Sequence, residues 1–229
     1  MKIKTALILC AGYGKRLHPI TKKVPKPLIK IKNKILLKNT INLAISLGIK
    51  DIKINTFYLE DKISEYVNTL NLPAKIKVIS DGEKILDTGG GILNLVKHSL
   101  DKDFIILNPD TLWNLNYKKN IKAMVNFYFK NNIKNILLVV NKNKSFDKRL
   151  KGDFNLKKNN LSQKNSKKYI FTGCQIINRN VFKKNRSKVF SISIIWNELL
   201  NKNLLYGFES KLKFLHLTDI KIYRNLTKT

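Results

Sequence analysis

A glycine turn and two cationic residues near the start of the chain could bind a phosphorylated ligand. The turn Gly12–Gly14 directly follows an apolar run, and Arg16 stands two residues beyond it. Glycines allow unusual backbone angles and let backbone N–H groups approach an anion closely, while a guanidinium group donates several hydrogen bonds to phosphate oxygens. Lys26 lies between two prolines, which fix the local backbone and limit where its ammonium group can go. These residue types and spacings indicate a phosphate-binding site.

The glycine turn differs from two common nucleotide-binding motifs. Leu17 stands where the third glycine of the dinucleotide-binding fingerprint would fall, and the spacing of the P-loop is absent. An ordinary turn between a strand and a helix, followed by a basic loop, would account for the glycines. It would not account for a lysine between Pro25 and Pro27. The combination is therefore more specific than the glycine turn alone.

Asp110 is the strongest candidate for holding a metal ion. It follows the apolar run Phe104–Leu107, where a buried strand is expected to end, and α/β proteins bind ligands at that edge of the sheet. A carboxylate offers the oxygen ligands that Mg²⁺ prefers, so His216, three residues before the carboxylate Asp219, ranks lower as a ligand. The alternative is a turn residue after Pro109.

Apolar strands alternate with amphipathic helices, and these elements must position the candidate residues. The expected strands are Ile3–Cys10, Ile52–Phe57, Ile76–Ile79, Phe104–Leu107, Ile136–Val140, Tyr169–Ile177, Leu204–Phe208 and Leu212–Leu217. The expected helices are Ile35–Leu47, Asp61–Leu70, Thr88–Leu95, Ile121–Phe129, Ser191–Leu200 and Asp219–Leu226. This alternation indicates βαβ units and a mainly parallel sheet. Residues 141–168 are polar and basic, with a short strand expected within Gly152–Leu156.

The segment Leu9–Leu17, together with Pro25–Leu28, resembles the signature of the sugar nucleotidyltransferase family. Members of that family join a nucleoside triphosphate to a sugar 1-phosphate. The resemblance also includes Leu86–Ile92, Asn108–Asp110, Gly152–Phe154 and Phe171–Gly173. It implies a three-layer, Rossmann-like nucleotidyltransferase fold with a mainly parallel mixed central sheet. We expect one domain over residues 1–229, in which residues 1–140 bind the nucleotide and residues 141–229 bind the sugar phosphate.

The resemblance also implies roles for individual residues on the nucleotide side. Glycine-loop residues and Arg16 would bind phosphates, Lys26 would contact the reacting phosphates, and the start of the Thr88 helix would lie against base and ribose. The implied residues are Ala11, Gly12, Gly14, Arg16, Lys26, Thr88, Gly89 and Gly90. Alternatively, Thr88 caps its helix and the glycines permit tight packing. Both interpretations can hold together, because a helix N-terminus also favours anions.

On the metal and acceptor side the match to the family is less complete. Asp110 and Asp219 correspond to metal-binding residues, but the residues around Asp219 depart from the family pattern, so Asp219 could instead cap the last helix. Asn108 and Gly173 would lie near the sugar. A Glu-Lys-Pro acceptor motif is absent, as in the bacterial N-acetylmuramate-1-phosphate uridylyltransferases. This favours UTP and N-acetylmuramate 1-phosphate as substrates, with Mg²⁺ as cofactor; GTP with mannose 1-phosphate, as in the guanylyltransferases, is the alternative.

Composition bounds the remaining possibilities. The formal net charge of +30 comes from 45 basic and 15 acidic residues, and it could indicate nucleic-acid binding. Lys, Asn and Ile, which AT-rich codons encode, are all abundant and the lysines are scattered, so compositional bias is favoured and nucleic acid is not the expected partner. A nucleotide-binding protein without catalysis is a further alternative. Cys10 and Cys174 are expected to be buried thiols in a cytoplasmic protein, and no apolar stretch is long enough to span a membrane.

Overall fold

The computed structural model describes residues 2–164, 166–182 and 187–228, and within them a sheet of nine strands forms the centre. Across the sheet, the strands are β5 (Lys75–Ser80), β4 (Asp51–Thr56), β1 (Thr5–Leu9), β6 (Asp103–Leu107), β10 (Tyr169–Asn178), β7 (Asn135–Asn141), β11 (Tyr206–Ser210), β9 (Asn160–Ser162) and β8 (Asn155–Lys157). Strands β5, β4, β1 and β6 are parallel neighbours, as are β7 and β11. Strand β10 runs antiparallel between β6 and β7, which makes the sheet mixed.

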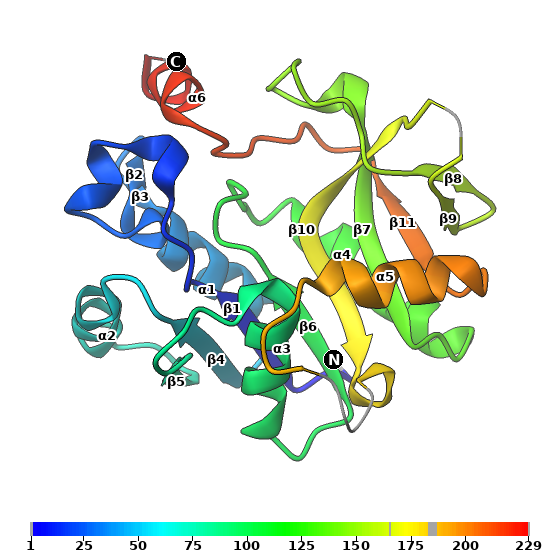
Figure 1. The fold of residues 1–229 in the computed structure, drawn as a ribbon, viewed down its shortest axis with the longest axis horizontal. Helices are drawn as coiled ribbons and strands as arrows, with labels where there is room; N and C mark the ends of the chain where they lie inside the picture. The colour runs from blue at the N-terminus through cyan, green and yellow to red at the C-terminus, as the bar shows by residue number, and fades with distance from the viewer. Residues whose placement is uncertain (1, 165, 183–186, 229) are drawn as a thin grey trace.

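Helices cover both faces of this sheet (Figure 1). One face carries α1 (Leu36–Ser46), α2 (Glu60–Asn68) and α4 (Tyr117–Lys130), and the other carries α3 (Asp87–Lys97) and α5 (Ile192–Asn201). Helix α6 (Ile220–Lys228) packs near a small hairpin of β2 (Lys30–Ile31) and β3 (Lys34–Ile35). Short 3₁₀ helices are η1 (Lys15–Leu17), η2 (Ile20–Lys22), η3 (Lys26–Leu28), η4 (Lys142–Lys144) and η5 (Arg179–Val181). The predicted three-layer fold with a mixed central sheet is confirmed.

The central strands read as continuous apolar runs because both of their faces are buried. In β1, Ala6 and Ile8 join the core under α1 and α4, whereas Leu7 joins the core under α3 and α5. In β6, Ile105 and Ile106 divide between the two cores in the same way. This follows from the alternation of side chains along a strand.

The predicted strand Leu212–Leu217 is wrong in the described structure. The segment is extended, but it makes isolated bridges, Thr111 with His216 and Ser145 with Phe214, instead of following one strand. Leu217 N donates to the carbonyl oxygen of Asp110 at 2.8 Å. The apolar pattern therefore reflects burial of a segment that crosses between loops. The sequence pattern also did not predict β9 or the β2–β3 hairpin, whose strands have only two or three residues.

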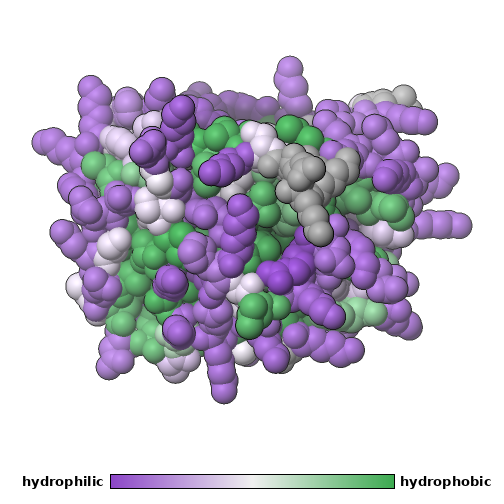
Figure 2. Space-filling model, turned by 60° about the horizontal axis from the view of Figure 1, so that its bottom comes forward, coloured by the Kyte–Doolittle hydropathy of each residue, from purple (hydrophilic) through white to green (hydrophobic). Residues whose placement is uncertain are grey.

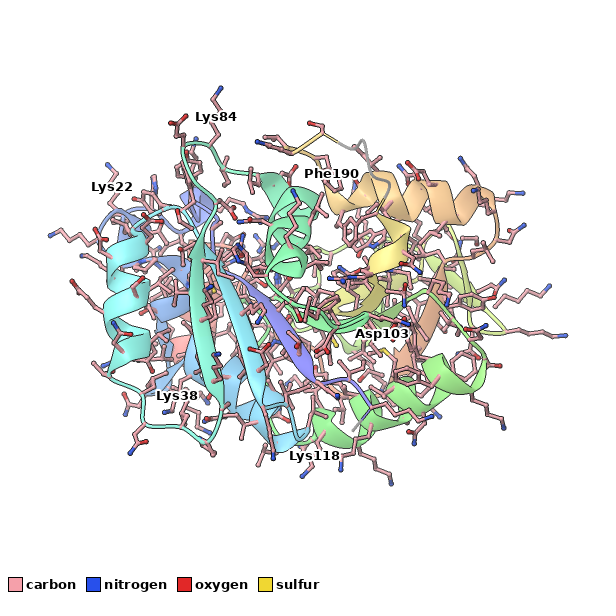
Figure 3. The ribbon with its side chains drawn as sticks, turned by 90° about the horizontal axis from the view of Figure 1, so that it is seen from below. Lys22, Lys38, Lys84, Asp103, Lys118 and Phe190 are labelled. Atoms are coloured by element: carbon pink, nitrogen blue, oxygen red, sulfur yellow. The ribbon has the colours of Figure 1, made fainter. Side chains whose placement is uncertain are left out.

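Positive charge is spread over the surface. Figure 2 shows a face covered mostly by hydrophilic residues, with smaller hydrophobic areas between them. In Figure 3 the lysines Lys22, Lys38, Lys84 and Lys118 come from different elements and lie on different sides of the molecule. No helix in the described part of the chain combines the length and apolar character that a membrane span requires.

The glycines at the start of α3 allow a close approach of the segment that leads into α5. Gly89 N and Gly90 N donate to the carbonyl oxygen of Phe190 at 2.9 and 3.0 Å, and Figure 3 labels Phe190 between these two helices. A Cβ atom at position 90 would collide with the carbonyl oxygen of Lys188. The Phe190 ring therefore occupies the space that a side chain at Gly89 would need, and the Lys188 backbone occupies the space at Gly90.

We expect Gly90→Ala to destabilise the fold by about 1–3 kcal/mol, the typical cost of overpacking a filled site. The collision is with backbone, so the 188–190 segment must shift to relieve it. Urea unfolding measures the effect. Gly12→Ala is the matched control, because no atom lies within 4 Å of a Cβ placed there, and its stability should stay within about 0.5 kcal/mol of wild type. Equal stability of Gly90→Ala and wild type would contradict the packing role.

Candidate active site

A pocket of about 380 Å³ lies where the loops after β1 and β6 meet. Parallel strands end at the same edge of a sheet, so these loops converge there. The predicted residues that line the pocket are Ala11, Gly12, Gly14, Arg16, Lys26, Thr88, Asn108 and Asp110. The predicted residues that are not among its lining residues are Gly89, Gly90, Gly173 and Asp219.

The glycine loop leaves the sheet at the end of β1 and turns at Gly14. Gly14 has a φ of 65°, in the left-handed region that favours glycine. A Cβ atom there would lie 2.9 Å from the Thr21 side chain, whose hydroxyl donates to the Gly14 carbonyl oxygen at 2.9 Å. The turn continues directly into η1, which contains Arg16. The local backbone therefore explains why this loop requires a glycine and how it brings Arg16 to the pocket.

Lys26 and Asp110 meet in the pocket although 84 residues separate them. The Lys26 Nζ lies 2.7 Å from Asp110 Oδ2, and the side chains are only 16% and 23% exposed. The short helix η3 begins at Lys26, after an extended Pro25. Each residue was predicted for the site separately, but nothing in the sequence predicted that they pair.

His216 completes the surroundings of Asp110. Its Nε2 lies 3.2 Å from Asp110 Oδ2, and its ring stacks on Phe214. Burial alone would raise the pKa of Asp110, but the nearby Lys26 and His216 outweigh it and hold this pKa well below its usual range. Asp110 is therefore ionised. The other oxygen, Oδ1, is buried without a hydrogen-bond partner among the described residues.

Asp219 lies at the start of α6, where both of its oxygens accept hydrogen bonds. Oδ1 accepts from Ile222 N at 3.0 Å, and Oδ2 accepts from Arg149 at 2.7 Å. Arg149 also makes two bonds to the buried Asp147 at 2.8 and 2.7 Å. Asp147 in turn accepts from the hydroxyl of Thr218, which lines the pocket. Asp219 thus makes the capping contact that the sequence offered as the alternative, and its metal role stays a prediction.

Gly173 shapes the loop that carries Asn108. Strand β10 shifts register between Phe171 and Gln175, and Gly173 within this irregularity has a φ of 86°. Asn108 N donates to the Gly173 carbonyl oxygen at 2.8 Å, and a Cβ atom at Gly173 would lie 2.9 Å from the Asn108 Cβ. The glycine therefore permits contact with the loop beside the pocket.

Four polar residues that line the pocket were not among the predicted site residues: Lys15, Asn55, Asp87 and Thr218. Asn55 lies near the end of β4, beside the end of β1. This position of a polar residue at a strand end was the sequence signal that could have identified it. Asp87 has a φ of 58° and precedes Thr88.

The predicted burial of both cysteines is confirmed. Burial raises the pKa of the pocket-lining Cys10 thiol, and the Asp110 charge raises it further, so this thiol is protonated.

Comparison with known proteins defines the class. A family model described as nucleotidyl transferase matches residues 5–146. This match covers more than half of the chain, and the chain belongs to that family. The resemblance predicted from Leu9–Leu17 and Pro25–Leu28 is thereby confirmed.

Three curated relatives match about half of this chain. The bifunctional protein GlmU of Methanococcus maripaludis (strain C5) is 40% identical over 108 residues, which are 47% of this chain and 25% of that protein. The D-glycero-alpha-D-manno-heptose 1-phosphate guanylyltransferase of Campylobacter jejuni is 34% identical over 50% of this chain and 51% of its own length. The N-acetylmuramate alpha-1-phosphate uridylyltransferase of Caulobacter vibrioides is 25% identical over 48% and 47%. The chain thus spans a quarter to about half of the length of these relatives.

A solved structure supports the fold over the whole chain. HddC from Yersinia pseudotuberculosis, complexed with GMP-PN, superposes with a TM-score of 0.76 and covers 99% of both chains. The sequence identity is 21%, so this likeness shows the fold alone.

The Arg149 network predicts a change in acid stability. Hydrogen bonds from Arg149 lower the pKa of Asp147 from 3.8 to about 2. Because the pKa in the folded state lies below that in the unfolded chain, the ionised Asp147 stabilises the fold above about pH 4, and this contribution is lost as the pH falls from about 4 to about 2. We expect Arg149→Met to be less stable than wild type at pH 6, with the difference narrowing at pH 3.

Urea unfolding at pH 6, 4 and 3 measures this difference. The exposed neighbour Lys151 offers a control, since Lys151→Met removes a positive charge without touching Asp147. A stability difference between Arg149→Met and wild type that is constant from pH 6 to pH 3 would show that the pairing does not set the pKa of Asp147.

Proposed function

We propose that this protein transfers a nucleotidyl group from a nucleoside triphosphate to a sugar 1-phosphate, giving a nucleoside diphosphate sugar and pyrophosphate. The observation that carries the proposal is the Lys26–Asp110 ion pair of 2.7 Å beside the glycine loop. It puts a cation for phosphate and an ionised carboxylate for a metal ion in one pocket. Membership of the nucleotidyl transferase family supports the same reaction.

The reaction requires positioning and charge neutralisation more than proton transfer. An oxygen of the sugar phosphate attacks the α-phosphorus, a new P–O bond forms, and the bond to the bridging oxygen of pyrophosphate breaks. The attacking oxygen is already ionised near neutral pH, so a general base is not needed. Arg16 and Lys26 neutralise charge on the triphosphate, and the glycine loop orients it. Cys10 is protonated and therefore a poor nucleophile. This is consistent with direct transfer between the substrates, without a covalent intermediate on the enzyme.

The residues present fit a divalent cation at Asp110. The buried Oδ1 has no hydrogen-bond partner among the described residues, and a carboxylate oxygen is the kind of ligand that Mg²⁺ prefers. A bound Mg²⁺ would neutralise phosphate charge. Asp219 is proposed as a second ligand, and for this role it must exchange its bond to Arg149.

In this proposal each half of the chain binds one of the two substrates. Residues 1–140 bind the nucleotide, because all but one of the pocket-lining residues belong to them. Residues 141–229 bind the sugar phosphate, with Thr218 contributing to the pocket and Asn108 and Gly173 forming the junction. The buried free thiols suit the reducing cytoplasm.

We favour UTP and N-acetylmuramate 1-phosphate as substrates, because the Glu-Lys-Pro acceptor motif is absent and a relative is named for that reaction. A mannose-1-phosphate guanylyltransferase is the second candidate, since a relative named for that reaction is 33% identical over 120 residues. Each nucleoside triphosphate should be incubated with N-acetylmuramate, mannose and glucose 1-phosphates, and pyrophosphate release measured. Release with UTP and N-acetylmuramate 1-phosphate is expected. Release only with GTP and mannose 1-phosphate would favour the second candidate, and no release with any pair would contradict both substrate assignments.

Lys26→Ala should lower turnover at least tenfold while the fold survives, because removing a group that stabilises transition-state charge typically costs a few kcal/mol of barrier. Steady-state pyrophosphate release gives the rate, and circular dichroism checks the fold. Lys22→Ala, at an exposed lysine of η2, is the matched control and should keep the wild-type rate. An unchanged rate for Lys26→Ala would remove Lys26 from the mechanism.

A further inference from the structure

The glycine loop is held to the sheet by a side chain of the neighbouring strand. Cys10, the first residue after β1, donates its backbone N–H to Asn55 Oδ1 at 3.0 Å and to the Asn55 carbonyl oxygen at 3.2 Å. Asn55 is only 3% exposed, and it also lines the pocket. Buried polar groups of this kind define one geometry when they are fully paired. The Asn55 amide is therefore part of the junction where the chain leaves the sheet and enters the glycine loop.

A buried carboxylate determines which way the Asn55 amide points. Asn55 Nδ2 donates to both oxygens of Asp81 at 3.2 Å, and an ionised carboxylate only accepts. The amide nitrogen must face Asp81, so the amide oxygen must face Cys10 N. Asn94 Nδ2 also donates to Asp81 Oδ1, at 3.4 Å, which adds a second donor around the same carboxylate.

The third glycine of α3 makes room for this pair. A Cβ atom at Gly91 would lie 2.6 Å from Asn55 Nδ2, closer than a side chain could approach without displacing the amide. Gly89 and Gly90 allow the close contact with residues 188–190, whereas Gly91 leaves room for the Asn55 amide. Asn55, Asp81 and Gly91 thus converge on the start of the glycine loop.

We propose that Asn55, oriented by Asp81 and given room by Gly91, is a positioning residue that holds the glycine loop in the geometry that binds the triphosphate. The ligand in this statement rests on the proposed function; the restraint on the loop does not. Asn55 acts through the Cys10 N–H and makes no chemical step of its own. Its loss should weaken nucleotide binding in protein that is still folded.

Exchanging the two polar groups tests the proposal. Asn55→Asp places two carboxylates in contact at a buried site, where like charges disfavour each other, and should raise the Kd for UTP and GTP at pH 8, in the presence of Mg²⁺, at least tenfold. It should also speed hydrogen exchange in residues 10–17 without nucleotide. The double variant Asn55→Asp/Asp81→Asn restores one carboxylate and one amide, with the carboxylate at position 55 accepting from Cys10 N. It should bring Kd and exchange back to within about threefold of wild type.

A second amide–carboxylate pair in the sheet provides the matched control. Asn178 Nδ2 donates to Asp103 Oδ1 at 2.6 Å, at the opposite end of β6 from the pocket, where Figure 3 labels Asp103. Asn178→Asp creates the same like-charge contact there. It should lower Tm without changing nucleotide Kd or exchange in residues 10–17.

The readouts separate a positioning role from a structural one. If Asn55→Asp lowers Tm but leaves hydrogen exchange in residues 10–17 unchanged, the proposal is overturned. The same holds if the double variant recovers Tm without recovering loop protection. If wild type binds neither nucleotide, the proposed function fails, but exchange in the glycine loop still decides whether Asn55 restrains it.

Discussion

Strand β1 pairs in parallel with β4 on one side and with β6 on the other, and the site depends on this pairing. The registers place Leu9 beside Asn55 and Ile8 beside Leu107, so the three strands end together. Both faces of β1 are buried, and a slip of one residue would exchange the two cores. The strand therefore has one register, and the glycine loop, Asn55 and the Asp110 loop meet as a consequence.

Charge within the pocket is balanced between segments distant in sequence. Burial disfavours the ionised Asp110, but Lys26 and His216 outweigh that cost, so the carboxylate is charged in the folded protein. The crossing segment that carries His216 is held by backbone bonds to the loops after β6 and β7. The same segment ends at Asp219, which caps α6 and pairs with Arg149. A single stretch of chain thus connects the electrostatics of the pocket with the packing of the last helix.

The three glycines of α3 make close packing contacts in the folded protein. The sequence leaves two interpretations open, contact with base and ribose or tight packing. The structure gives each glycine a protein neighbour: residues 188–190 for Gly89 and Gly90, and the Asn55 amide for Gly91. Thr88 alone among the predicted residues of this segment lines the pocket. The ligand roles of Gly89 and Gly90 remain predictions.

The sequence by itself determined the buried strands, most helices and the position of the glycine loop, because apolar periodicity and glycine or proline geometry act over a few neighbouring residues. It also indicated Asp110, because this residue follows a buried strand at the edge of the sheet where α/β proteins bind ligands. Only the tertiary structure decided that Lys26 pairs with Asp110, that His216 joins them and that Asn55 holds the glycine loop. These contacts join segments that are distant in the sequence, so patterns over a few neighbouring residues do not predict them. Which polar groups meet depends on how the loops converge when both faces of the sheet are covered.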